Sequence, residues 1–260
     1  MAEERTVAAT EADSEEAAGV PDWRRTLWVM VGIQFIMTMA FSVLSPIMPL
    51  FLPELGVKNP AAIDIWAGIL GGSTSFVAAF VSPLWGRVAD RRGRKLMLLR
   101  SSLAIGFFTA LMGAAGDVWQ FFAFRALMGV FAGFSSAAIA LVASQVPEGR
   151  LGYSLGWLST GQLVGSLVGP IIGGALADLT GSYRMPFYCT SATILFSAGL
   201  VWFAVHERFS PAPRGRQQRS VLEALVTLAQ SPGLLALFFV LLMAQFGVRT
   251  VQPVVTLYVQ

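Results

Sequence analysis

Seven apolar stretches recur along this chain, and their length constrains its fold more than any other feature. A helix of about 20 apolar residues crosses a hydrocarbon layer roughly 30 Å thick. Only 13% of the 260 residues are charged, against roughly 25% in a soluble domain. We therefore predict an all-α integral membrane protein. The expected spans lie near residues 26–50, 66–86, 97–115, 119–142, 152–176, 185–205 and 233–257.

The positive charges are distributed unevenly between the two sides of these spans. If the N-terminus is cytoplasmic, 14 of the 18 Lys and Arg residues fall on the cytoplasmic side. Lys58 and Arg184 fall on the outer side, and Arg125 and Arg249 lie within spans. Short loops rich in Lys and Arg stay in the cytoplasm, so we predict a multi-pass protein of the inner membrane with a cytoplasmic N-terminus. This asymmetry explains the net charge of +3 without a nucleic-acid partner.

The apolar and polar stretches divide the chain into four regions. Residues 1–24 are predicted to be a disordered cytoplasmic tail, because they are rich in acidic residues and lack the pattern of a secretory signal. Residues 25–206 are predicted to form an N-terminal domain of six transmembrane helices. Residues 207–232 are predicted to be a basic cytoplasmic linker containing an amphipathic helix. Residues 233–260 are predicted to be the first transmembrane helix of a C-terminal domain.

Residue types that support enzyme or metal chemistry are scarce. The single cysteine, Cys189, cannot form an internal disulfide, and the single histidine, His206, makes no metal site alone. The sequence shows neither a nucleophile–base pair nor a phosphate-binding loop. We therefore expect no enzyme activity, no metal and no cofactor.

The loop predicted between the second and third spans concentrates charge in "GRVADRRGRK", residues 86–95. Glycine permits the positive φ of a tight reversal, and Asp90 gives the bases an acidic partner or accepts bonds from a helix N-terminus. This order resembles the loop signature G-x-x-x-D-R-x-G-R-[RK] of the major facilitator superfamily. A topology signal alone would explain the bases but neither Asp90 nor Gly93. The pattern predicts a conformational latch made of Gly86, Asp90, Arg91, Gly93, Arg94 and Lys95.

The fifth span contains glycines at four-residue intervals within "GQLVGSLVGPIIGG". Residues four apart share a helix face, so this span presents a surface that lacks side chains. Ordinary packing of small residues would explain the glycines alone. The full pattern resembles the antiporter signature of the superfamily, G-x-x-x-G-P-x-x-G-G, which implies export in exchange for protons. The gating helix is therefore expected to use Gly161, Gly165, Gly169, Pro170, Gly173 and Gly174.

Arg125 lies several residues from either end of the fourth span, where a charge costs about 2.5 kcal/mol or more. It resembles the arginine of the superfamily motif R-x-x-x-G-x-x-x-G, which is linked to proton transfer, with Gly129 and Gly133 expected on the same helix face. Snorkelling to the surface is the alternative. No acid lies well inside a span, so Asp64, near an outer end, and the polar Gln34 of span one are the other candidates for a proton-linked or cavity site.

The resemblance implies a major facilitator fold, with two six-helix halves that rock around a central site. The segments "SPIMPLFL" and "QPVVTLYV", late in spans one and seven, fit a parallel repeat of these halves. The chain would then hold the first half and one helix of a second. The implied function is drug:proton antiport by a monomer that handles small lipophilic or amphiphilic substrates, protons and membrane lipids. An uptake carrier for a sugar or organic acid, and a non-transporting receptor or scaffold, remain alternatives.

Overall fold

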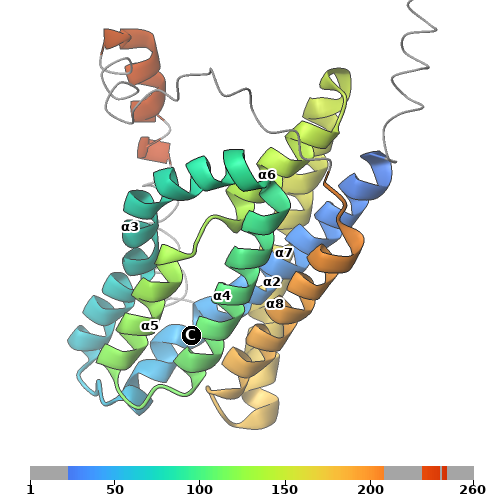
Figure 1. Ribbon diagram of the computed structural model, residues 1–260. Coiled ribbons are helices and arrows are strands. Elements are labelled where there is room, and N and C mark those ends of the chain that lie inside the picture. Colours follow the sequence, from blue (N-terminus) through green and yellow to red (C-terminus); the bar gives the residue numbers. More distant parts are fainter. Residues whose placement is uncertain (1–22, 208–229, 241, 245–260) are drawn as a thin grey trace, which may run out of the picture. The chain divides into compact units, whose positions relative to one another are not determined.

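The computed structural model describes residues 23–207, 230–240 and 242–244, which are helical over most of their length (Figure 1). The chain divides into two compact units, Met1–Pro211 and Ala212–Gln260. In the second unit, an apolar helix runs over Pro232–Ala244. Much of the predicted seventh span, the acidic tail and the basic linker lie outside the described residues.

The described part of the first unit contains 6 helical segments that are long and apolar enough to cross a membrane. They confirm the first six predicted spans and the all-α class. In chain order the elements are α2 (Trp23–Phe51), η1 (Leu52–Leu55), α3 (Pro60–Arg92), α4 (Arg94–Gly113), α5 (Val118–Val130), α6 (Phe134–Gln145), η2 (Glu148–Arg150), α7 (Leu151–Thr180) and α8 (Met185–Ala204).

Local signals in the sequence explain where several of these helices begin and end. The Asn59 side chain accepts a hydrogen bond from the Ala61 amide at the start of α3 (3.1 Å). Asp117 caps α5 by accepting bonds from the Trp119 and Gln120 amides (2.8 Å each). Side-chain acceptors of this kind satisfy amides that the first turn of a helix leaves unpaired.

The fourth span is broken into α5 and α6 by residues 131–133, where Gly133 has a φ of +117°. Our prediction that Gly133 lies on the same helix face as Arg125 and Gly129 was therefore wrong. Glycine adopts this left-handed conformation without the steric penalty of a side chain. The glycine of the motif ends one helix and starts another instead of extending a packing face.

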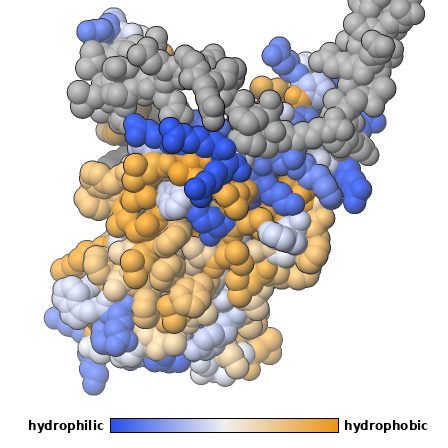
Figure 2. All heavy atoms as spheres, viewed as in Figure 1, coloured by the Kyte–Doolittle hydropathy of each residue, from blue (hydrophilic) through white to orange (hydrophobic). Residues whose placement is uncertain are grey.

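Helix α2 packs against α7, α8 and α6, while α4 packs on α8 and α3 on α5 (Figure 1). Phe51, Phe121 and Phe187 are fully buried and join α2, α5 and α8, with ring centroids 5.2–5.8 Å apart. Only 6% of the most apolar stretch of α3 is buried. Figure 2 shows hydrophobic residues across the middle of the visible face, as expected of a surface that meets lipid or other helices.

Candidate functional site

Arg125 is bound to the backbone of the neighbouring helix rather than extended along its own. It lies about 10 Å along α5, and its Nε donates to the Leu70 carbonyl of α3 (2.6 Å). The Thr74 hydroxyl of α3 donates in return to the Arg125 carbonyl (3.1 Å). A Cβ at Gly129, one turn further on, would lie 2.6 Å from the Thr74 carbonyl oxygen. Glycine at this position allows the close approach that these hydrogen bonds require.

The break in the fourth span is held by side chains that the sequence analysis missed. The Trp85 indole of α3 donates to the Val130 carbonyl (2.7 Å), and Arg100 Nη2 of α4 donates to the Ala132 carbonyl (3.1 Å). The Arg100 guanidinium also lies over the Trp85 ring, 3.5 Å from its centroid. Arg100 is one of the 14 Lys and Arg residues that the charge distribution placed on the cytoplasmic side. Its position seven residues into an apolar helix was the signal that it is not a surface charge.

Gln34 lies in the core of the first unit instead of on an open cavity wall. Only 2% of its surface is exposed, and its Nε2 donates to the Ser135 hydroxyl of α6, just after the break (3.4 Å). Within the described residues, its Oε1 has no hydrogen-bond partner. The structure therefore places Gln34 beside the break and does not support a role for it in lining an open cavity.

The acidic residues near the span ends lie away from Arg125. Asp64 is exposed near the start of α3 and, within the described residues, forms no ion pair with Arg125. Asp117 is occupied as the N-cap of α5. Asp178 is exposed near the end of α7. The Arg125 site is therefore built from carbonyl oxygens and a hydroxyl.

The turn between α3 and α4 pivots on Gly93, whose φ is +93°. The first two amides of α4, from Arg94 and Lys95, donate to Oε1 and Oε2 of Glu207 (2.8 Å each). Lys95 Nζ also donates to the Trp202 carbonyl of α8 (2.8 Å). Glu207, beyond the end of α8, thus accepts bonds from the N-terminus of α4. A carboxylate at this position is favoured by the helix dipole.

The glycine face of α7 meets the backbone of α2. A Cβ added to these glycines would lie 2.4–2.9 Å from atoms of α2, closer than real Cβ atoms approach a neighbour. Among the described residues, nothing lies within 4 Å of a Cβ at Gly86 or Gly174, so no neighbouring helix approaches closely at either position. Pro170 lies within α7, which continues past it to Thr180. The four glycines in contact with α2 are Gly161, Gly165, Gly169 and Gly173.

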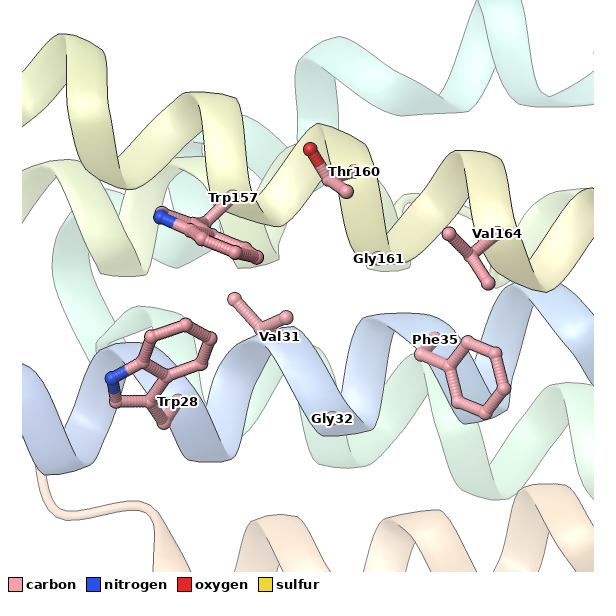
Figure 3. Close-up of a pocket in the computed structure, with 8 residues that line it drawn as sticks. All are labelled: Trp28, Val31, Gly32, Phe35, Trp157, Thr160, Gly161 and Val164. Atoms are coloured by element: carbon pink, nitrogen blue, oxygen red, sulfur yellow. The ribbon is translucent and has the colours of Figure 1, made fainter.

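An apolar cavity of about 340 Å³ lies along the same α2–α7 contact (Figure 3). The Trp28 and Trp157 rings lie at one end of it, with their centroids 4.8 Å apart. Val31 and Phe35 of α2 face Gly161 and Val164 of α7 along its length. A second cavity of about 280 Å³ lies between α3 and the break, where Trp85 and Gly133 line it.

Comparison with known proteins agrees with this architecture. The family model described as "Major Facilitator Superfamily" matches residues 30–260. The chain belongs to the major facilitator superfamily. This confirms the predicted family, one of transporters and not of enzymes.

Curated relatives in this superfamily include "Multidrug resistance protein MdtG" of Yersinia enterocolitica, which is 39% identical over 239 residues. The protein of the same name from Serratia proteamaculans is 42% identical over 242 residues. Each alignment covers 92% of this chain but only 57% or 58% of the relative. The chain therefore spans less than two thirds of the length of the curated relatives it matches.

Solved structures of major facilitator proteins share the fold. A bacterial homologue of the human lysosomal transporter Spinster matches 82% of this chain and 50% of its own, with a TM-score of 0.66 and 19% identity. The human organic anion transporter MFSD10 matches 72% of this chain and 48% of its own, with a TM-score of 0.63 and 19% identity. The predicted major facilitator fold is thereby confirmed.

Proposed function

We propose that this chain is the N-terminal part of a drug:proton antiporter that exports small lipophilic or amphiphilic molecules. The observation that carries the proposal is the 39–42% identity, over 92% of the chain, with proteins named for multidrug resistance. We further propose that the protein works as a monomer among inner-membrane lipids, with its N-terminus in the cytoplasm. The excess of Lys and Arg on one side of the spans supports this orientation.

In this proposal, α7 is a gating helix that moves together with α2. Close backbone contact along the glycine face supports a common movement, because interdigitated helices shift as one body more readily than they slide. Pro170, within the gating helix, removes one backbone donor at the level of this contact.

The turn from Gly86 to Lys95 is proposed to act as the conformational latch. Glu207 and Lys95 attach the start of α4 to the end of α8, so a movement of α4 against α8 has to strain or break charged hydrogen bonds. Asp90, Arg91 and Arg94 are the other charged members of the proposed latch.

Arg125 is proposed to organise the proton-linked site. Its guanidinium is held at membrane depth by an α3 carbonyl, where a charge is kept only with polar partners. Asp64 is the acid of this chain that we propose for proton loading, because its carboxylate is exposed near the start of α3. If Asp64→Asn retains wild-type efflux under a pH gradient, the coupling carboxylate is not Asp64.

Everted membrane vesicles that contain the complete protein test the proposed function. An acidic vesicle interior should drive accumulation of a fluorescent lipophilic dye such as ethidium, and a protonophore should abolish it. Vesicles that contain an equal amount of the Arg125→Lys protein are the matched comparison, and they should accumulate less dye. Equal dye accumulation with and without the transporter, across cationic, neutral and anionic dyes, would contradict drug export.

A further inference from the structure

We propose that Arg100, acting with Trp85, is a positioning residue that fixes α5 and thereby the Arg125 site; its part in transport rests on the proposed function. The relevant contacts lie at the break between α5 and α6, and they involve three helices. Trp85 comes from α3, Arg100 from α4, and the carbonyl groups that they bind come from the fourth span.

The break leaves backbone acceptors that the fourth span cannot satisfy itself. A helix end exposes carbonyl groups, which carry a partial negative charge and need donors. Trp85 donates to the Val130 carbonyl and Arg100 donates to the Ala132 carbonyl, two residues later. Both donors therefore bind where α5 ends, and Arg100 brings the positive charge that this end favours.

The burial of Arg100 argues against a role as a topology signal. Arg100 as a whole is half-buried, but its Nε and Nη1 are inaccessible to solvent and, within the described residues, have no acceptor. The guanidinium face lies against Trp85 at 3.5 Å, an arrangement that offsets part of the lost hydration through cation–π attraction. A charge held in this way fixes the positions of the helices that it contacts.

The contacts of α5 show what this arrangement positions. Near its middle, α5 is attached to α3 by the Arg125–Leu70 and Thr74–Arg125 hydrogen bonds. At its end it is attached to α3 again, through Trp85. Arg100 joins this α3–α5 pair to α4 through two polar contacts, with the Ala132 carbonyl and with the Trp85 ring. Loss of Arg100 should therefore let the pair shift relative to α4 while its internal hydrogen bonds remain.

Spin-label distances in the complete protein test this displacement directly, in a background that carries Cys189→Ser. The distance between labels at Phe80 on α3 and Leu103 on α4 measures the position of the α3–α5 pair relative to α4. Both sites are exposed. The distance between labels at Phe80 and Leu127 measures the position of α3 relative to α5 within the pair. Leu127 is also exposed. In Arg100→Met, the Phe80–Leu103 distance should shift or broaden by about 2 Å or more, the scale of helix shifts in proteins. The Phe80–Leu127 distance should stay unchanged.

Arg100→Lys separates charge from geometry, since lysine keeps the charge but lacks the planar group that stacks on Trp85 while donating to a carbonyl. It should show the same change as Arg100→Met. Arg150→Met, which removes an exposed arginine on the same predicted side, should change neither distance. If Arg100→Met is made in low amounts, Trp85→Phe, which removes only the indole donor, should produce a smaller shift of the same kind.

Unchanged Phe80–Leu103 distances in Arg100→Met and Trp85→Phe would overturn the positioning role. Dye efflux gives the functional readout: the maximal rate should fall by on the order of tenfold, the scale of a desolvated cation–π contact, with the apparent KM nearly unchanged. If the Phe80–Leu103 distance shifts in Arg100→Met but efflux keeps wild-type kinetics, the link between Arg100 and the Arg125 site would be overturned. If the distances shift but even the wild-type protein exports no dye, the proposed function fails while the positioning of α5 stands.

Discussion

The α2–α7 and α3–α5 pairs both join long apolar helices, but they are held together in different ways. In the α2–α7 pair, glycines let the two backbones touch, and a Cβ at Gly173 would lie 2.4 Å from the Val43 carbonyl oxygen. In the α3–α5 pair, side chains donate across to backbone carbonyls, as Arg125 does to Leu70 at 2.6 Å. Backbone contact tolerates no added volume, whereas side-chain hydrogen bonds can be exchanged for others. We infer that the α2–α7 pair is held rigidly together, whereas the contact within the α3–α5 pair is adjustable.

A larger residue in the glycine face should produce the largest effect. Gly169→Leu places new atoms where even a Cβ would lie 2.5 Å from Ser42 Cβ, so we expect destabilisation by about 1–3 kcal/mol or more and loss of efflux. Gly174→Leu, on the same helix with nothing within 4 Å of its Cβ, is the matched control. Thermal unfolding in detergent and cysteine labelling of the inward- and outward-open states measure the effect. A Gly169→Leu protein that is as stable as the control and still samples both states would show that the α2–α7 contact does tolerate added volume.

The turn at the end of α3 should be the next most sensitive place. Asp90 is the only acid among residues 84–100, so Asp90→Asn removes the negative charge of the proposed latch while keeping its shape. We expect nearly unchanged insertion and abundance but strongly reduced dye efflux. Quantitative immunoblots and vesicle efflux together provide the measurement. Normal efflux at wild-type abundance would contradict the latch and would leave the turn with the role of a topology signal alone.

Glu207 should have a smaller effect, because it acts on one helix end. Glu207→Gln removes the negative charge that faces the first amides of α4 and should cost about 0.3–1 kcal/mol. Glu148→Gln, in the exposed η2 turn, is a control for the loss of a carboxylate. The shift in unfolding temperature relative to this control is the measurement. Equal shifts would show that the cap does not stabilise α4.

A comparably small effect is expected at Thr74, within the adjustable pair. Thr74→Val removes the hydroxyl that donates to the Arg125 carbonyl and should cost about 0.5–1.5 kcal/mol, while Arg125 keeps its bond to Leu70. Thr74→Ser keeps the hydroxyl and should restore most of the loss. Unfolding temperature and dye efflux are both informative here. A cost for Thr74→Val as large as that for Gly169→Leu would argue against an adjustable pair.

The spans were predictable because bilayer thickness sets the length of an apolar helix, independently of its neighbours. The glycine face was also visible, since four-residue spacing places Gly161 to Gly173 on one side of a helix. Their packing partner was not, because α2 lies more than 100 residues earlier in the chain.

The break and the caps escaped prediction for the same reason. Gly133 stands in an apolar run that is long enough for one helix, and what supports the break comes from Trp85 and Arg100, 45 and 32 residues away from the carbonyls they bind. Glu207 caps α4 across a separation of 113 residues. Local patterns show which residues are unusual, but the fold decides which ones meet.

The account depends most on the planar guanidinium of Arg125 being required at the α3 carbonyl. The most direct test is efflux driven by an imposed pH gradient in vesicles with equal amounts of wild-type and Arg125→Lys protein. Lysine keeps the charge and much of the reach but not the fork of donors, so we predict a fall of about tenfold or more, the scale of one lost charged hydrogen bond, with normal insertion. Full efflux by the lysine variant would show that Arg125 merely places a charge and would contradict the account.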